Sequence, residues 1–415
     1  MGNRIVAIVF IFFCTAVAWM ILGATISSRT YEADTRLENK VASGWGTRQT
    51  QTPPNATYWV TRTKTQESTE NGQKVTRQVE QSIPVVLPLE SSRINVALNL
   101  DYRQKGLLWY STYAVDFSGE YGFRNTSSQE ENVNFQLNLP ASKAIYDDLA
   151  VLVNGKPVAI TTNNNGASAA VAVPAGSAVL VAFTYRSQGM ESWAYRFGDD
   201  VAQVRNFSLD LKTNFKDVDF PQDTLSPTEK HAIPGGWVLG WKYKNLLSGV
   251  QIGTTMPEKL QPGPLAGQIS YFAPVSLFFF FFVIFIITTL RGNDLHPMNY
   301  FFLATAFFAF HLLLAYLVDH ISVHLAFVVC SAVSVFLVVS YLRLVVGLRF
   351  AALEAGLAQL IYLVLFSYAF FFKGFTGLAV TIGAILTLFV VMQMTGRVRW
   401  SEKFASKPVG AVSPL

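Results

Sequence analysis

The sequence predicts a mixed membrane protein, with an α-helical transmembrane bundle of six spans and a large all-β, sandwich-like extracytoplasmic domain. Three observations support this fold class. The 415 residues are 51% hydrophobic and 14% charged, well below the roughly 25% charge of a soluble protein. Six apolar runs have about the 20 residues that cross the ~30 Å hydrocarbon core of a bilayer. Between the first two runs lies a polar region with the two-residue alternation of β-strands.

The first run, Ile5 to Ala24, predicts an uncleaved anchor within residues 1–26. It is longer than the ~7–15 residues of a signal-peptide core, and no small-x-small pair marks a cleavage site at its end. The segment TYEADTRLENKVASGW, directly after the anchor, has the pattern of a short amphipathic helix.

Residues 27–268 form the predicted β domain. In segments such as NVNFQLNL and AVLVAFTY every second residue is apolar, so each strand buries one face and exposes the other to water. The pair Asn154-Gly155 provides the positive φ angles of a tight hairpin turn. Many short strands with turn signals indicate an antiparallel sandwich or a pair of sandwiches, and the alternation does not choose between one and two subdomains.

Five further apolar runs make up a membrane block at 269–396, before a tail at 397–415. They cover about 271–290, 300–318, 322–342, 355–372 and 375–394. Each run must be helical, because backbone polar groups cannot stay unpaired in lipid.

Loop charges predict the orientation of the spans. A cytoplasmic N-terminus also places Arg291, Arg343 and the basic tail on that side, and leaves Asp319-His320 and Lys373-Gly374 outside. This is the positive-inside pattern. We therefore expect both termini to be cytoplasmic and residues 27–268 to be periplasmic, in the inner membrane of a two-membrane bacterium.

The net charge of +5 belongs to the membrane regions. Outside residues 27–268 there are nine basic and four acidic residues, so the predicted β domain is neutral overall. A nucleic-acid-binding protein would concentrate positive charge on a folded surface, so we expect no nucleic acid partner. The two cysteines, Cys14 and Cys330, lie in apolar runs, which excludes a disulfide framework for the β domain. We interpret Cys14 as a core thiol.

The polar stretch RGNDLHPMNY lies between the second and third runs. Pro297 suits the first position of a helix, because its missing N–H would have no partner there. His296 is then the extended residue before the helix, and Asp294 lies near the positive helix end. Turn formation therefore explains this stretch, and the alternative is that His296 is a proton or ligand site.

Two other groups of polar residues lie in or near the spans. His311 is the one ionisable side chain deep in a run, which makes it a candidate for proton handling. No charged partner accompanies it, so we favour a neutral imidazole that is hydrogen-bonded to a Ser or Tyr of a neighbouring span. Asp319, His320 and His324 have a spacing that could bind a transition metal on a helix, or else they form a hydrated loop.

The remaining motifs indicate packing rather than chemistry. Small residues recur in two runs, and small residues let membrane helices approach closely. They are Ala326, Cys330 and Ser334 in the fourth run, and Gly377, Gly383 and Ala384 in the sixth. The sequence has no phosphate-binding glycine loop, zinc-protease helix or nucleophile elbow. We therefore expect no enzyme activity, no catalytic residues, no cofactor and no metal.

The stretch HPMNYFFLATAFFAFHLLLAYLVDHISVHLAF resembles the corresponding stretch of the CreD family of bacterial inner-membrane proteins. His296, Pro297, Met298 and Tyr300 match a turn of that family, and Asp319-His320 matches its acidic-His pair, with Asp where Glu is more usual. The segments SGWGTRQTQTPP and KGLLWYSTYAVDFSGEYGF resemble the family more loosely. His311 and His324 lie outside the family pattern.

The resemblance implies a role in cell-envelope integrity and stress responses, often under two-component control, and it implies no catalytic residues. We expect a non-enzymatic protein whose periplasmic domain binds an envelope protein or a cell-wall component, with the lipid bilayer as its other partner. The alternatives are a transporter or channel with His311 as its proton-sensitive element, and an intramembrane metalloenzyme that uses Asp319, His320 and His324. The oligomeric state is left open.

Overall fold

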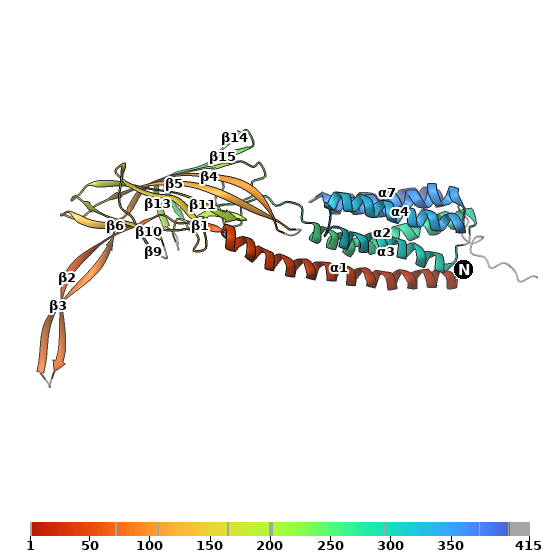
Figure 1. The fold of residues 1–415 in the computed structure, drawn as a ribbon, viewed down its shortest axis with the longest axis horizontal. Helices are drawn as coiled ribbons and strands as arrows, with labels where there is room; N and C mark the ends of the chain where they lie inside the picture. Colours follow the sequence, from red (N-terminus) through yellow and green to blue (C-terminus); the bar gives the residue numbers. More distant parts are fainter. Residues whose placement is uncertain are drawn as a thin grey trace, which may run out of the picture. The chain divides into compact units, whose positions relative to one another are not determined.

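The computed structural model describes residues 2–70, 73–105, 108–163, 166–198, 202–293, 295–372, 374–396 and 398. Asp294, Lys373 and nearly all of the tail at 397–415 lie outside the described residues. The chain divides into two compact units, a helical unit of residues 1–36 and 260–415 and a β unit of residues 37–259 (Figure 1).

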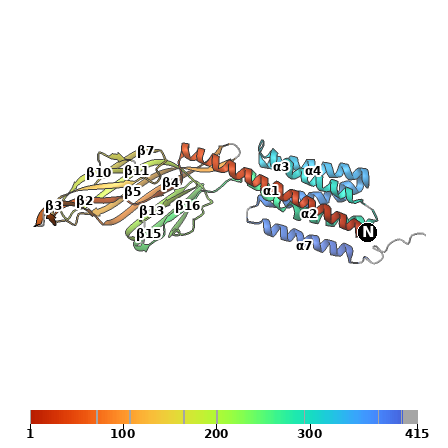
Figure 2. The ribbon, with the colours of Figure 1, turned by 90° about the horizontal axis from the view of Figure 1, so that it is seen from below.

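Within its described residues, the helical unit contains six helices that are long and apolar enough to cross a membrane (Figure 2). They are α1 (Gly2–Trp45), α2 (Pro262–Arg291), α3 (Pro297–Leu317), α4 (Val323–Val345), a fifth span over Phe350–Phe371, and α7 (Thr376–Thr395). The fifth span is built from short pieces: η1 (Phe350–Ala355), α5 (Gly356–Gln359), η2 (Leu360–Leu365), α6 (Phe366–Tyr368) and η3 (Ala369–Phe371). The six apolar spans that the sequence predicts are therefore all present as helices.

Helix α1 extends much further than the predicted anchor. The expected amphipathic helix at 30–45 is the C-terminal part of α1 itself, because no proline or glycine interrupts the chain between Thr25 and Ser43. Gly46 follows the helix with a φ of 117°, a value that glycine adopts without strain. The boundary between the units therefore falls inside α1, at 36/37 rather than 26/27, and the second boundary falls at 259/260 rather than 268/269.

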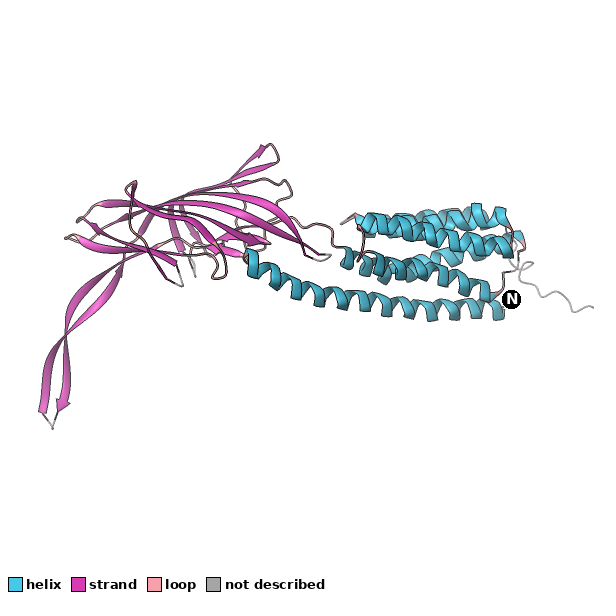
Figure 3. Ribbon diagram, in the orientation of Figure 1, coloured by secondary structure: helices cyan, strands magenta, loops and turns pink. Residues whose placement is uncertain are grey.

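The described residues of the β unit form three sheets, and Figure 3 shows their long strands. The eight-stranded sheet has the order β14-β15-β13-β4-β5-β11-β7-β8 and the five-stranded sheet the order β3-β2-β6-β10-β9; the third sheet is β1-β12-β16. The strands of the eight-stranded sheet are β4 (Leu89–Lys105), β5 (Leu108–Arg124), β7 (Tyr146–Val153), β8 (Lys156–Pro157), β11 (Ala178–Met190), β13 (Ala202–Thr213), β14 (Glu229–Ile233) and β15 (Gly236–Ser248). The others are β1 (Gln49–Gln51), β2 (Asn55–Glu70), β3 (Gln73–Val86), β6 (Glu131–Asn138), β9 (Thr161–Asn163), β10 (Gly166–Val173), β12 (Ser192–Tyr195) and β16 (Ile252–Thr255).

The predicted alternation builds one core from the two larger sheets. Val181 and Phe183 of β11 and Val133 and Phe135 of β6 are all fully buried in the same cluster. The rings of Phe123 and Phe135, one from each sheet, lie 5.6 Å apart. Burying these apolar faces removes their surface from water, which is the main favourable contribution to folding of such a unit.

Two details of the β unit test the predicted strand arrangement. The hairpin turn at Asn154-Gly155 is confirmed, with φ angles of 51° and 76° between β7 and β8. The expectation of purely antiparallel sheets is wrong, because β13 pairs with β4 in parallel, and so does β1 with β12. A parallel pair needs a long crossover connection, and the chain between β4 and β13 provides one.

Candidate functional site

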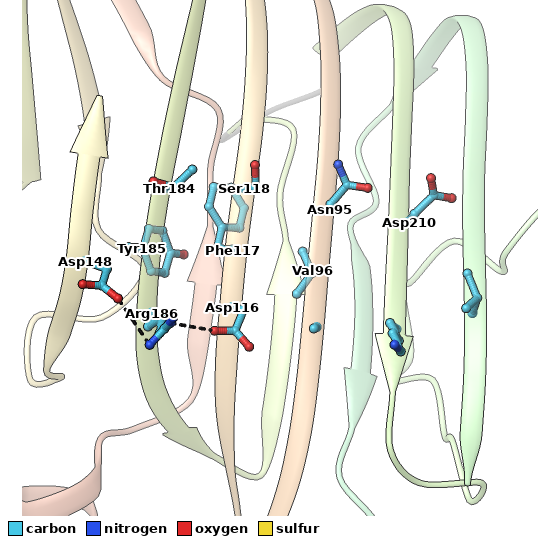
Figure 4. Close-up of a pocket in the computed structure, with 13 residues that line it drawn as sticks. Asn95, Val96, Asp116, Phe117, Ser118, Asp148, Thr184, Tyr185, Arg186 and Asp210 are labelled. Atoms are coloured by element: carbon cyan, nitrogen blue, oxygen red, sulfur yellow. Dashed lines mark ion pairs between the residues drawn. The ribbon is translucent and has the colours of Figure 1, made fainter. Parts of the chain in front are cut away.

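The eight-stranded sheet contains a hollow of about 610 Å³, lined by apolar side chains such as Phe117 and Val238 and by a set of polar ones (Figure 4). Its strands bury every second residue in the core, so the intervening residues form a solvent-facing surface. At one level of this face Thr184, Ser118, Asn95 and Asp210 lie side by side on β11, β5, β4 and β13. With strands about 4.8 Å apart, this row of short polar groups extends over about 14 Å.

Arg186 forms the charged side of the hollow. Its guanidinium lies 3.3 Å from an Asp116 carboxylate oxygen and 3.3 Å from an Asp148 carboxylate oxygen (Figure 4). The register of β7 against β11 shifts between Thr184 and Arg186, and Asp148 at this irregularity has a φ of 51°. Such a bulge re-aims a side chain, and here it turns Asp148 toward Arg186.

These ion pairs place charged groups on the protein surface and contribute little to the folding stability. The three side chains are 64%, 53% and 62% exposed for Arg186, Asp116 and Asp148. An exposed ion pair stabilises a fold by about 0–1 kcal/mol. The arrangement instead holds one cation between two carboxylates, at a position where a polar ligand can exchange hydrogen bonds with all three groups.

A second charged cluster lies at the β14–β15 side of the same sheet. Asp210, the last residue of the polar row, lies on β13, and Lys212 follows two residues later on the same strand. Gly240 lies opposite Asp210 on β15. Next to it, the Lys242 ammonium donates to Glu229 at 2.8 Å, and this hydrogen bond holds the pKa of Glu229 below its ordinary value. The face therefore carries carboxylates, hydroxyls and amides in a row with cations beside them, which suits an extended, hydrogen-bonding ligand. The described residues contain no group of three His, Cys, Asp or Glu that could hold a metal ion.

The sequence did not identify this hollow. The alternation along each strand identifies its apolar positions, but it does not show which polar positions of different strands lie side by side. Which strands are neighbours decides that Arg186 meets Asp116 and Asp148, and that pairing is a tertiary property.

The turn at 296–300 is a helix start, as the turn interpretation expects. Pro297 is the first residue of α3, and His296 is its N-cap, whose Nδ1 accepts a hydrogen bond from the Met298 N–H at 3.2 Å. Tyr300 is fully buried. The Tyr341 hydroxyl donates to the Asn299 side chain at 2.8 Å and ties the turn to α4. Asp294, which is expected to lie near the positive end of this helix, is outside the described residues.

His311 is buried, but its predicted partner is wrong. Its Nδ1 lies 3.1 Å from the Phe307 carbonyl, one turn earlier on α3, instead of contacting a Ser or Tyr of another span. The imidazole packs against the rings of Trp19 and Phe310, at centroid distances of 5.6 and 4.9 Å. Aromatic packing thus surrounds the one deep histidine.

Asp319, His320 and His324 do not form a metal site. Asp319 pairs with the Arg29 guanidinium at 2.9 Å. His320 lies in the turn before α4, so it does not share one helix face with His324. The His324 ring instead packs against Phe371, with centroids 5.2 Å apart. The loop interpretation describes these residues better than the metal interpretation.

The small-residue prediction is half right. Ala326, Cys330 and Ser334 are fully buried in α4. Gly377 and Gly383 in α7 face open space instead, and Cys14, expected as a core thiol, is exposed on α1. A composition pattern shows which residues permit close packing, but not which helix receives a neighbour.

The spans also contain a polar network that the sequence analysis missed. Gln359 in α5 is fully buried, and its amide donates to the Ser334 hydroxyl at 2.8 Å. Ser334 in turn donates to the Ala306 carbonyl at 2.9 Å. A glutamine within an apolar run was the available signal, since polar side chains in spans join helices by hydrogen bonds.

Comparison with solved structures gives only distant likenesses. A Legionella pneumophila protein, provisionally described as nutrient binding, is 10% identical with a TM-score of 0.31, over 46% of this chain and 72% of that one. An M1 zinc metallopeptidase from Deinococcus radiodurans is 10% identical with a TM-score of 0.28, over 41% of this chain and 42% of that one. Neither likeness supports an argument about chemistry. No curated protein matches the chain.

The family comparison covers almost the whole sequence. The model of the family described as inner membrane protein CreD matches residues 1–261 and 268–401. The match includes the whole β unit and all six apolar helices except the first residues of α2. The protein therefore belongs to the CreD family of inner membrane proteins.

Proposed function

We propose that this inner-membrane protein is a non-enzymatic factor in cell-envelope integrity and stress response, and that it binds an envelope component through its β unit. In this proposal the β unit is a periplasmic, sandwich-like domain, and both chain termini are cytoplasmic. The family supports the membrane location, and the basic residues of the short loops support the orientation.

The polar groups of the hollow around Arg186 are the observation that carries the binding role. A row of hydroxyl, amide and carboxylate groups beside a bridged guanidinium offers donors and acceptors to one extended ligand. Polar groups of this kind fix the orientation of a ligand and give specificity. Envelope polymers and the exposed segments of envelope proteins have the matching hydroxyl, amide and carboxylate groups.

The transport alternative receives no support from His311. A proton-handling histidine needs polar partners through which protons move. The His311 ring is 1% exposed, and its neighbours are the rings of Trp19, Phe307 and Phe310.

Complementation of a deletion strain tests the proposal. Loss of the gene should increase sensitivity to detergent and to wall-targeting antibiotics, and the wild-type chain should restore tolerance. Arg186→Glu reverses the charge between Asp116 and Asp148 without touching the core, so this variant should be expressed normally and fail to restore tolerance.

Lys156→Glu is the matched control, because it makes the same charge change on β8, away from the residues that line the hollow. It should complement fully. Full complementation by Arg186→Glu would exclude the hollow as the binding site. A deletion strain with unchanged sensitivity would contradict the envelope role itself.

A further inference from the structure

An apolar groove of about 260 Å³ lies between α1 and α2 in the helical unit. Five residues of α1, between Ile5 and Phe13, line one side of it. Phe278, Phe281, Phe282 and Phe285 of α2 line the other. All nine side chains are apolar, and the groove is open to the surroundings of the span, where Val9 is 46% exposed and Phe278 50%.

The sequence explains why a groove forms here. The four phenylalanines recur at three- and four-residue intervals, so they share one face of α2. Ile5, Ile8 and Val9 on α1 have shorter side chains that do not fill the space between these rings. Phe12 meets Phe278 at a centroid distance of 6.1 Å, which brings the two helices together at the far end of the groove.

A cation lies at the other end. The Arg4 guanidinium is 5.9 Å from the centroid of Phe285, the last ring of the groove. The Tyr300 hydroxyl has the side chains of Arg4 and Thr288 as polar neighbours. Tyr300 packs edge-on against Phe281, a wall of the groove, at 5.3 Å. The buried tyrosine of the 296–300 turn therefore lies between the groove wall and the cation.

We propose that this groove binds one acyl chain of an anionic phospholipid, and that Arg4 binds the phosphate of that lipid. From Ile5 to Phe13 the groove covers about 12 Å of helix, close to the ~15 Å of one leaflet's hydrocarbon. An acyl chain gains packing contacts with the phenylalanine rings. A guanidinium beside a phosphate forms charge-assisted hydrogen bonds. A zwitterionic lipid has the same phosphate, but its ammonium group offsets the attraction to the guanidinium, so an anionic lipid is favoured.

The charge at this end of the spans favours an anion. Arg291 pairs with Glu354, and the end of α4 contributes Arg343. Each basic residue near a membrane surface attracts an anionic headgroup. This inference does not depend on the binding role of the β unit, because it concerns the helical unit alone.

Lipid retention by the full-length protein tests the proposal. The protein is purified in mild detergent, mixed with equal amounts of phosphatidylglycerol and phosphatidylethanolamine, and analysed by native mass spectrometry. The wild type should retain phosphatidylglycerol about fivefold better. Arg4→Gln should abolish this preference, and Arg4→Lys should keep most of it.

Two further variants separate the groove from the cation. Val9→Trp places a large ring in the groove and should reduce the retention of both lipids. Val17→Trp makes the same change at an exposed position of α1 outside the groove and should behave as the wild type. Arg343→Gln removes an exposed cation of α4 that does not line the groove, so it should weaken the lipid preference much less than Arg4→Gln does.

Three results would overturn the proposal. In the first, Arg4→Gln keeps the preference for phosphatidylglycerol. In the second, Arg343→Gln removes the preference as fully as Arg4→Gln does, which would indicate general surface charge. In the third, Val9→Trp retains as much lipid as Val17→Trp, which would show that the groove is not the site.

Discussion

Single polar side chains hold together parts of the β unit that are distant in sequence. Asn125 is fully buried after β5, and its amide donates to the carbonyls of Gln129, Val173 and Pro174 at 3.0, 2.9 and 3.2 Å. Its side-chain oxygen accepts from the Ser127 N–H at 2.9 Å. Asn125 therefore provides hydrogen-bond partners for backbone groups of two separate loops. Without such partners, burial of these backbone groups would cost free energy.

Asn125→Ala should lower the free energy of unfolding of the β unit by about 3 kcal/mol, because buried carbonyls and an N–H lose their partner. Thermal and urea unfolding, followed by tryptophan fluorescence, measure this change. Asn132→Ala, at an exposed position of β6, should alter stability by less than about 0.5 kcal/mol. Equal effects of the two changes would show that the Asn125 hydrogen bonds do not stabilise the fold.

Buried tyrosines make the β unit sensitive to alkali. Burial raises the pKa of Tyr113, Tyr121, Tyr185 and Tyr195 above the ordinary value of 10.0. It raises the pKa of Tyr146 to about 12. The folded state therefore binds these phenol protons more tightly than the unfolded state does, so their contribution is complete below pH 10 and is lost as pH rises through 12.

An alkaline titration should show tyrosinate absorbance rising together with the loss of native tryptophan fluorescence. The urea-unfolded chain should titrate near the ordinary pKa of tyrosine, about 10. In Tyr185→Phe, which lacks one of these phenols and its 2.7 Å hydrogen bond to Gln51, the folded state should lose stability less steeply with pH. If all the tyrosines ionise near pH 10 while the fold is retained, the phenols are not buried as described.

At the scale of elements, the hairpin β2–β3 differs from the rest of the β unit. Its two strands pair from Thr57↔Val86 to Glu70↔Gln73, but only residues 55–57 of β2 also pair with β6 (Figure 1). Among the hairpin side chains whose burial is described, at 55–65 and 78–86, the buried ones are Ala56 and Tyr58 at the base. A two-stranded ribbon is marginally stable by itself in water, so the outer part of the hairpin contributes little to the stability of the fold.

Removing residues 63–80 and joining Arg62 to Gln81 through an Asn-Gly turn should change the unfolding free energy of the β unit by less than about 0.5 kcal/mol. In the described part of this segment, 63–70 and 73–80, the two strands pair with each other and with no third strand. Tyr58→Ala at the buried base is the contrasting change, and it should cost about 3 kcal/mol. Strong destabilisation by the shortened hairpin would mean that its outer part packs on the unit.

The fifth span shows why a correct apolar run does not fix helix geometry. The structure places two wide helical turns, η1 and η2, on either side of α5. The Tyr362 carbonyl within η2 accepts a hydrogen bond from the Ser276 hydroxyl of α2. Such wide turns occur mostly as local departures from α-helix and often at functional positions. The run length predicted the span, but it carries no information about these wide turns or about the hydrogen bond from α2.

At the scale of the whole molecule, the proposed orientation makes a direct prediction. Single cysteines at Ser128 in the β unit and at Leu348 between α4 and the fifth span should lie on opposite sides of the membrane. With Cys14 and Cys330 replaced by alanine, a membrane-impermeant maleimide should label Ser128→Cys in intact spheroplasts. It should label Leu348→Cys only after lysis, and the reverse pattern would invert the proposed topology.

The sequence alone determined the membrane class, the six spans, the strand alternation and the family. These properties depend on composition and on short-range periodicity, which are local. The start of α3 at Pro297 and the hairpin at Asn154-Gly155 were predictable for the same reason, because one residue fixes φ and the other permits a positive φ.

Only the tertiary structure decided which side chains meet. The Arg186 hollow depends on the order of β7, β11 and β5 in the sheet, and the pairing of Gln359 with Ser334 depends on how α5 packs against α4. The partner of His311 and the environment of Cys14 were mispredicted for the same reason. Contacts between residues far apart in sequence follow from packing, and periodicity along one segment carries no information about its neighbours.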